Sequence, residues 1–66
     1  MTYTYFISYH WYRFDEDSFD NGVFELDYEL VTEDDFDAAE EFIATHRVVG
    51  MRYSIRIMWF QLLKKI

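Results

Sequence analysis

Residues 2–13 read TYTYFISYHWYR, and this stretch decides the fold. Tyr, Phe, Ile, Thr and Trp are residue types that β-strands favour, and no Gly or Pro interrupts them here. We therefore predict one long strand over residues 2–13. Because side chains alternate between the two faces of a strand, one of its two sides must face the core. We expect this to be the odd side, which runs from Tyr3 to Trp11, although Phe6 and Tyr12 make the even side apolar as well.

Short polar side chains gather in the next segment, residues 14–22, which ends in Asn21-Gly22. Such a cluster is typical of a hairpin loop. Apolar and acidic residues then alternate, which predicts a second strand over residues 23–31 with one solvated face. The apolar side carries Phe24, Leu26, Tyr28 and Leu30, and the acidic side carries Glu25, Asp27 and Glu29.

A helix start follows at Thr32, whose hydroxyl is a capping group, and the acids at residues 33–35 suit the positive end of the helix dipole. We predict a helix over residues 33–46. Helical spacing places Phe36, Ala39 and Ile43 on one apolar stripe. The opposite side carries Glu33, Asp34, Asp37 and Glu41.

Strand-forming residues return near the end of the chain and predict a third strand over residues 52–63, after a break at Gly50. Strict alternation of side chains along this strand predicts that the core side carries Tyr53, Ile55, Ile57 and Trp59. The other side then carries Arg52, Ser54, Arg56, Met58 and Phe60.

Connection rules arrange these elements as one ββαβ domain over residues 1–66, of the α+β class. The first two strands form an antiparallel hairpin. A helical crossover returns the third strand beside the first, which gives the strand order 2-1-3. One helix then packs on one face of a three-stranded sheet.

Composition narrows the class of protein. The 66 residues include no cysteine, which excludes disulfides, thiolate metal sites and thiol catalysis. The N-terminus lacks a positively charged head, and no apolar run approaches the roughly 20 residues that span a bilayer. We expect a cytoplasmic protein that does not contact membranes. A hydrophobic content of 52% predicts a folded chain despite the net charge of -7.

The charges are segregated along the chain. All 13 acidic residues fall between Asp15 and Glu41, a stretch without Lys or Arg, and all six basic residues lie outside it. Like-charge helical pairs such as Glu33 and Asp37 cost a few tenths of a kcal/mol each, and no lysine relieves them. Alternate strand acids are about 6.6 Å apart, a sparser version of the roughly 3.4 Å phosphate spacing along a nucleic-acid strand.

This pattern predicts an acidic surface that imitates a nucleic acid and binds a basic nucleic-acid-binding groove of another protein. The predicted partner-binding residues are Asp15, Asp17, Asp20, Glu25, Asp27, Glu29, Glu33, Asp34, Asp37 and Glu41. Solubility alone is the simpler explanation of the same acids.

The tyrosine-rich start at Tyr3, Tyr5 and Tyr9, the acidic loop, the Thr-capped acidic helix and the apolar last strand together resemble short ββαβ proteins of phages and prophages. The resemblance implies a phage accessory protein that acts in the host cytoplasm. Small acidic phage proteins include anti-CRISPR and anti-restriction inhibitors, which block nucleic-acid sites on host defence enzymes. No functional residue is carried over from the resemblance.

Catalytic and metal-binding motifs are missing from the sequence. His10 and His46 are the only histidines, and neither a catalytic triad nor a glycine-rich phosphate loop is present. We predict no enzyme activity, no cofactor and no metal, and we expect His46 to cap the helix C-terminus. A calcium loop starting at Asp17 would put Phe19 and Tyr28 at ligand positions, which leaves only weak, irregular cation binding as an alternative.

The second hypothesis concerns the sheet face that a single helix leaves uncovered. Its candidate interaction residues are Phe6, His10, Tyr12, Met58 and Phe60. An exposed apolar patch of this kind favours homodimerisation, which would make the chain a small structural or assembly protein whose acidity serves solubility. Direct nucleic-acid binding is excluded, because the net charge of -7 and the strand acids on this face repel phosphates.

Overall fold

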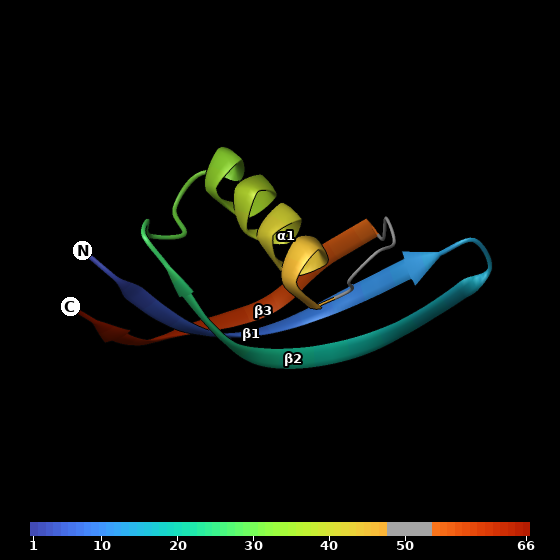
Figure 1. Cartoon of the computed structure of the whole chain (residues 1–66), viewed down its shortest axis with the longest axis horizontal. Helices are drawn as coiled ribbons and strands as arrows, with labels where there is room; N and C mark the ends of the chain where they lie inside the picture. The colour runs from blue at the N-terminus through green and yellow to red at the C-terminus, as the bar shows by residue number, and fades with distance from the viewer. Residues whose placement is uncertain (48–53) are drawn as a thin grey trace.

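The protein, described by a computed structural model at residues 1–47 and 54–66, has the element order ββαβ (Figure 1). Strand β1 spans Tyr3–Arg13, β2 spans Glu16–Leu26, helix α1 spans Glu33–Arg47 and β3 spans Ser54–Lys65. The strand order is β2-β1-β3, and β1 is antiparallel to both of its neighbours. The predicted α+β class and the 2-1-3 order are therefore confirmed.

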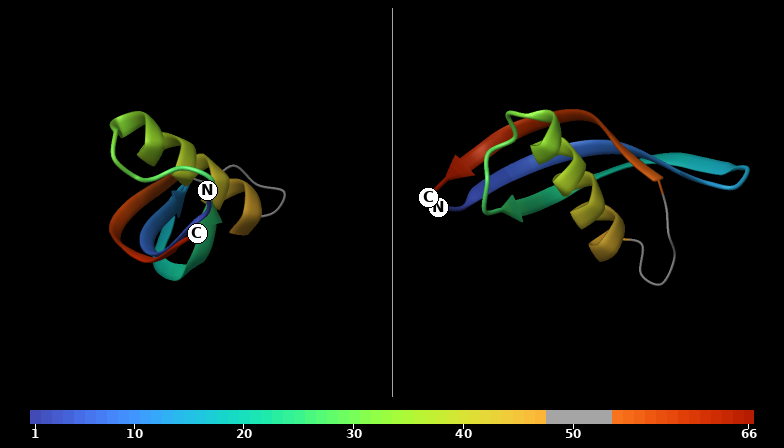
Figure 2. Two further views of the ribbon diagram at one scale, coloured as in Figure 1. Left: turned by 90° about the vertical axis from the view of Figure 1, so that its left-hand side faces the viewer. Right: turned by 90° about the horizontal axis from the view of Figure 1, so that it is seen from above.

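Helix α1 covers one face of the sheet and crosses it diagonally (Figures 1 and 2). Its first turn lies over β3, where Phe36 meets Phe60 with 5.2 Å between ring centroids. Further along the helix, Phe42 lies over β2 and meets Phe24 with 6.4 Å between centroids. The diagonal crossing lets one helix cover all three strands.

The core lies between α1 and the odd side of β1, as predicted. Tyr5, Ile7 and Tyr9 are each at most 2% exposed, because the helix stripe packs directly above them. The other buried residues are Phe24, Leu26, Leu30, Ala39 and Ile43. No charged side chain among the described residues is buried in this core.

Two polar side chains hold the layers together. The Tyr5 hydroxyl accepts a hydrogen bond from the backbone N–H of Leu30 at 3.0 Å, which fixes the connection after β2 against β1. The Glu40 carboxylate accepts one from the backbone N–H of Ile57 at 2.9 Å, which fixes α1 on β3. Each bond satisfies a backbone donor that would otherwise lose its hydrogen-bond partner on folding.

The predicted helix start is also confirmed. The Thr32 hydroxyl accepts a hydrogen bond from the Asp35 N–H at 3.3 Å, and the Asp35 carboxylate accepts in return from the N–H groups of Thr32 and Val31, at 2.8 and 3.1 Å. This reciprocal capping pattern satisfies three backbone donors at once. These hydrogen bonds hold the pKa of Asp35 below its ordinary value, because they stabilise its charged form.

The predicted hairpin and second strand are present, but their predicted bounds, residues 14–22 for the loop and 23–31 for the strand, are wrong. Arg13 pairs with Glu16, so only Phe14 and Asp15 form the turn, and β2 ends at Leu26. Pairing of Leu26 with Tyr3 sets the antiparallel register. The same ladder then extends back to Glu16, because polar residues can bond through their backbone while their side chains remain in solvent.

A β-bulge in β3 reverses the predicted sides of two residues. Tyr9 pairs with Ile57 but Ser8 pairs with Trp59, so Met58 is an extra residue and the alternation shifts by one. Trp59 therefore lies on the open face, and the prediction that Phe60 lies there is wrong. The Phe60 ring instead contacts Tyr5, with 5.9 Å between centroids. The predicted break at Gly50 and the predicted sides of Arg52 and Tyr53 concern residues outside the described part of the chain.

Candidate functional site

Seven carboxylates form what we name the acidic edge, along β2 and the segments that flank it. All seven are exposed. They are Asp15, Glu16, Asp17, Asp20, Glu25, Asp27 and Glu29. Because β2 is an outer strand, this edge is open to solvent along its whole length, about 35 Å for an 11-residue strand. The basic residues described with exposed side chains, Arg56, Lys64 and Lys65, belong to the opposite outer strand, β3.

The regular row of strand acids predicted from alternation is only partly formed. Glu25 lies within β2, whereas Asp27 and Glu29 follow its end in an irregular segment. All three remain exposed. Tyr28 between them is half-buried, and burial, followed by the nearby charges of Asp27 and Asp35, raises the pKa of its hydroxyl.

The helix acids form a second, separate group. Glu33, Asp34, Asp37 and Glu41 are all exposed on α1, as predicted. The helix starts over β3, whereas four acids of the acidic edge lie on β2, the other outer strand. Glu40 was missed as a structural residue, because it borders the apolar stripe and its carboxylate turns inward to the Ile57 N–H.

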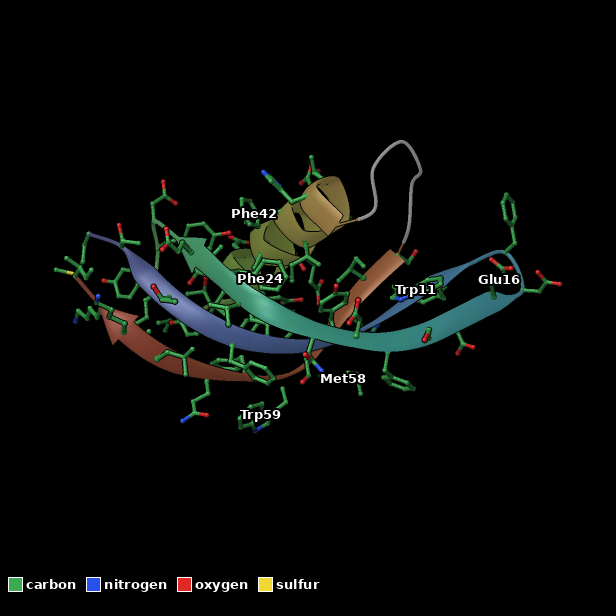
Figure 3. All side chains as sticks on the ribbon, turned by 60° about the horizontal axis from the view of Figure 1, so that its bottom comes forward. Trp11, Glu16, Phe24, Phe42, Met58 and Trp59 are labelled. Atoms are coloured by element: carbon green, nitrogen blue, oxygen red, sulfur yellow. The ribbon has the colours of Figure 1, made fainter. Side chains whose placement is uncertain are left out.

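The open face of the sheet, on the side away from α1, carries most of the predicted apolar patch. Phe6, His10 and Tyr12 lie on it, as expected for the even side of β1, and Met58 joins them. Figure 3 shows Met58 and Trp59 on one side of the sheet and Phe24 and Phe42 on the other. Trp59 is 53% exposed and meets Phe6 edge-on, with 5.8 Å between centroids.

Sequence reasoning missed two further members of the open face, Phe19 and Val23. Both were assigned to a loop or to the start of a strand, yet they pair with His10 and Phe6 of β1. Phe19 is 69% exposed, and its ring lies 4.8 Å from the ring of His10. Asp17, Phe19 and Val23 occupy alternate, odd-numbered positions, which is the spacing of residues on one side of a strand. The acidic composition of the segment instead indicated a loop.

The two histidines make local contacts. His10 Nε2 lies 3.0 Å from an Asp17 carboxylate oxygen at the far end of the hairpin. His46 Nδ1 lies 2.9 Å from the Phe42 carbonyl oxygen, and its ring stacks on Phe42, so the predicted cap at the helix end is confirmed. Within residues 1–47 and 54–66, no group of three or more His, Asp or Glu side chains is placed to hold a metal ion.

Comparisons with known proteins add no relative: no protein-family model, curated protein or solved structure matches the chain. No helix in the described part of the chain is long and apolar enough to cross a membrane. The two unusual surfaces of this protein are the acidic edge and the open face.

Proposed function

We propose that this chain is a non-enzymatic binding protein whose acidic edge occupies a basic, nucleic-acid-binding groove of another protein. The observation that carries the proposal is the acidic edge, whose seven exposed carboxylates lie between Asp15 and Glu29 with no Lys or Arg among them. Four of these residues, Glu16, Asp17, Asp20 and Glu25, lie on the extended outer strand β2. The other three lie in the turn before it and in the segment after it. Alternate residues of an extended strand are about 6.6 Å apart, so these carboxylates form a sparser line of negative charge than the phosphates of a nucleic-acid strand, which repeat at about 3.4 Å.

The electrostatics of the molecule support this proposal. A net charge of -7 on 66 residues attracts a basic surface over several ångströms and speeds association. Lys and Arg side chains in a groove attract anions from solution, and the carboxylates of the acidic edge attract cations. Association of the two surfaces releases both kinds of ion, as when a nucleic acid binds. Binding should therefore weaken steeply as salt rises.

The kind of partner follows from the sequence resemblance to short phage and prophage proteins. A phage protein of this form would act in the host cytoplasm on a defence enzyme that grips nucleic acid, in the manner of anti-CRISPR or anti-restriction inhibitors. We place the helix acids Asp34, Asp37 and Glu41 outside the primary contact. These three residues belong to α1, which begins over β3, and not to β2.

Two triple variants with the same change of charge test the proposal. In the edge variant, Asp15, Asp20 and Glu29 become Asn, Asn and Gln. In the helix variant, Asp34, Asp37 and Glu41 become Asn, Asn and Gln. Each protein is immobilised and exposed to bacterial lysate at 50 mM salt, and captured proteins are released with short duplex DNA and identified by mass spectrometry.

We expect the wild-type protein and the helix variant to capture the same DNA-releasable nucleic-acid enzyme. The edge variant should bind it at least tenfold more weakly in a titration with the purified enzyme. If duplex DNA releases nothing, mimicry is wrong. If the helix variant loses binding and the edge variant keeps it, the helix face is the contact surface and the acidic edge is not.

A further inference from the structure

We propose that the open face of the sheet binds a second copy of this chain, in a symmetric dimer whose two-fold axis runs parallel to β1. The open face exposes a band of large apolar side chains, because α1 covers only the other side of the sheet (Figure 3). Its most exposed members are Phe19 at 69%, Met58 at 56%, Val23 at 55% and Trp59 at 53%. This inference does not depend on the function proposed above.

The open face is bordered by acidic residues on β2 and by basic residues on β3. On the β2 side, Glu25 lies next to Thr4 of the central strand, and on the β3 side Lys64 lies next to the same Thr4. At the other end, Asp17 pairs with Tyr12, and Arg56 pairs with His10, two residues earlier. One flank is thus acidic and the other basic. Glu25 and Lys64 lie at the same height along β1, whereas Asp17 and Arg56 are offset by two residues.

These opposite charges do not pair within one chain. The strands β2 and β3 are separated by β1, so their backbones lie about 10 Å apart. None of Glu25, Arg56 and Lys64 forms an ion pair with another described residue. Asp17 already has a partner on its own chain, because His10 Nε2 lies 3.0 Å from its carboxylate, so the unmatched charges of this face are Glu25, Arg56 and Lys64.

The direction of the symmetry axis decides whether two such faces attract. An axis parallel to β1 places β2 of one copy opposite β3 of the other, so Glu25 faces Lys64 of the second copy and Asp17 approaches its Arg56. An axis in the same plane but perpendicular to β1 places β2 of one copy opposite β2 of the other. Glu25 of one copy then lies near Asp17 of the other. Like charges directly opposed across an interface cost affinity. The charge pattern thus selects the parallel axis.

The same axis matches the apolar side chains. Trp59 lies next to Ser8 on the β3 side, so it comes opposite Asn21 of the second copy, two residues from both Phe19 and Val23 on the open face of that strand. Arg56 comes opposite Phe19 of the second copy, since both lie next to His10. An arginine over an aromatic ring adds a cation–π attraction. Because the contact is isologous, every one of these pairs forms twice.

The size of the face sets the expected affinity. Three strands about 4.8 Å apart and about 35 Å long give a flat footprint of roughly 500 Å² per copy, or about 1,000 Å² in total. This lies at the lower limit of specific interfaces. We therefore expect dissociation in the micromolar range. Asp15, Asp20 and Glu29 stay outside the contact, so a dimer leaves most of the acidic edge accessible.

A charge-swap series tests the dimer and its axis by sedimentation velocity from 1 to 500 µM. Glu25→Lys and Lys64→Glu should each weaken the dimer at least tenfold, because each creates two like-charge contacts. The double variant should return to within about threefold of the wild type. Lys65→Glu is the matched control, since Lys65 pairs with Tyr3 on the helix side and its substitution should leave dimerisation unchanged.

Three results would overturn the inference. The first is a monomer mass of 8.2 kDa for the wild type over the whole concentration range. The second is a double variant that stays as weak as the single variants. The third is a dimer strengthened by Glu25→Lys alone, which would indicate the perpendicular axis. Trp59→Ser should weaken the dimer, and circular dichroism checks that each variant is folded.

Discussion

Removing one buried hydroxyl group gives the sharpest test of how the chain after β2 is held to the sheet. Tyr5 is 2% exposed, and its hydroxyl accepts a hydrogen bond from the Leu30 N–H at 3.0 Å. The substitution Tyr5→Phe keeps the ring and its edge contact with Phe60 but removes the acceptor. Leu30 is itself only 6% exposed, so water does not readily replace the hydroxyl.

The expected cost follows from leaving a buried N–H group without an acceptor, which is about 1–3 kcal/mol. A domain of 66 residues has a total free energy of unfolding of roughly 3–10 kcal/mol, so the loss is a large fraction of its stability. At about 4–8 °C per kcal/mol, a loss of about 2 kcal/mol lowers the melting temperature by roughly 8–16 °C.

The control substitution is Tyr3→Phe, which removes a hydroxyl that donates to the Met1 sulfur in an exposed position. Its cost should stay below about 0.5 kcal/mol, as for most surface changes. Urea denaturation measures both variants, and hydrogen exchange of the Leu30 amide should accelerate only in Tyr5→Phe. Equal losses in the two variants, or a protected Leu30 amide in Tyr5→Phe, would refute the reasoning.

Three further predictions concern the helix cap, the hairpin turn and the contact of the helix with β3. Because the pKa of Asp35 is lowered in the folded state, its contribution to stability is present above the unfolded value of about 3.9 and is lost as pH falls through the folded pKa. Asp35→Asn should therefore lose less unfolding free energy than the wild type between pH 6 and pH 3; equal losses in the two proteins would contradict the cap. Phe14 has a φ of 54°, in the left-handed region, so Phe14→Gly should stabilise the protein by about 0.5–1 kcal/mol in chemical denaturation, and a destabilised variant would count against this turn. Glu40→Ala removes the acceptor of the Ile57 N–H and should cost about 1–2 kcal/mol, whereas Glu40→Gln keeps an acceptor and should cost less than about 0.5 kcal/mol; equal costs would mean that the hydrogen bond is not maintained in solution.

The parts of the fold that follow from local chemistry were predictable. The β-forming composition of residues 2–13 predicts the central strand, and the alternation of apolar residues identifies the side of Tyr5, Ile7 and Tyr9 that is buried. The helix start at Thr32 depends on side chains within three residues of it. Each of these features depends on contacts between residues close in the sequence or on the regular alternation of apolar residues.

The predictions were wrong where pairing with a neighbouring strand determines the bounds of a strand or the side on which a residue lies. Polar residues 16–22 resemble a loop by composition, yet the register with β1 makes them part of β2. A single extra residue, Met58, inverts the exposure of Trp59 and Phe60, and nothing in the alternation of the third strand reveals it. The candidate open face was therefore predicted with Phe60 in place of Trp59, and without Phe19.

The separation of 13 acidic from six basic residues along the chain is a property of the sequence and does not depend on folding. The sequence by itself also determined the ββαβ order, since the period of the apolar residues changes from strand to helix and back. Only the tertiary structure decided where the charges lie. Pairing on either side of β1 places the acids on one outer strand and Arg56, Lys64 and Lys65 on the other. Strand register and the bulge at Met58 depend on contacts between distant segments, so they alone decide which aromatic side chains share the open face with those charges.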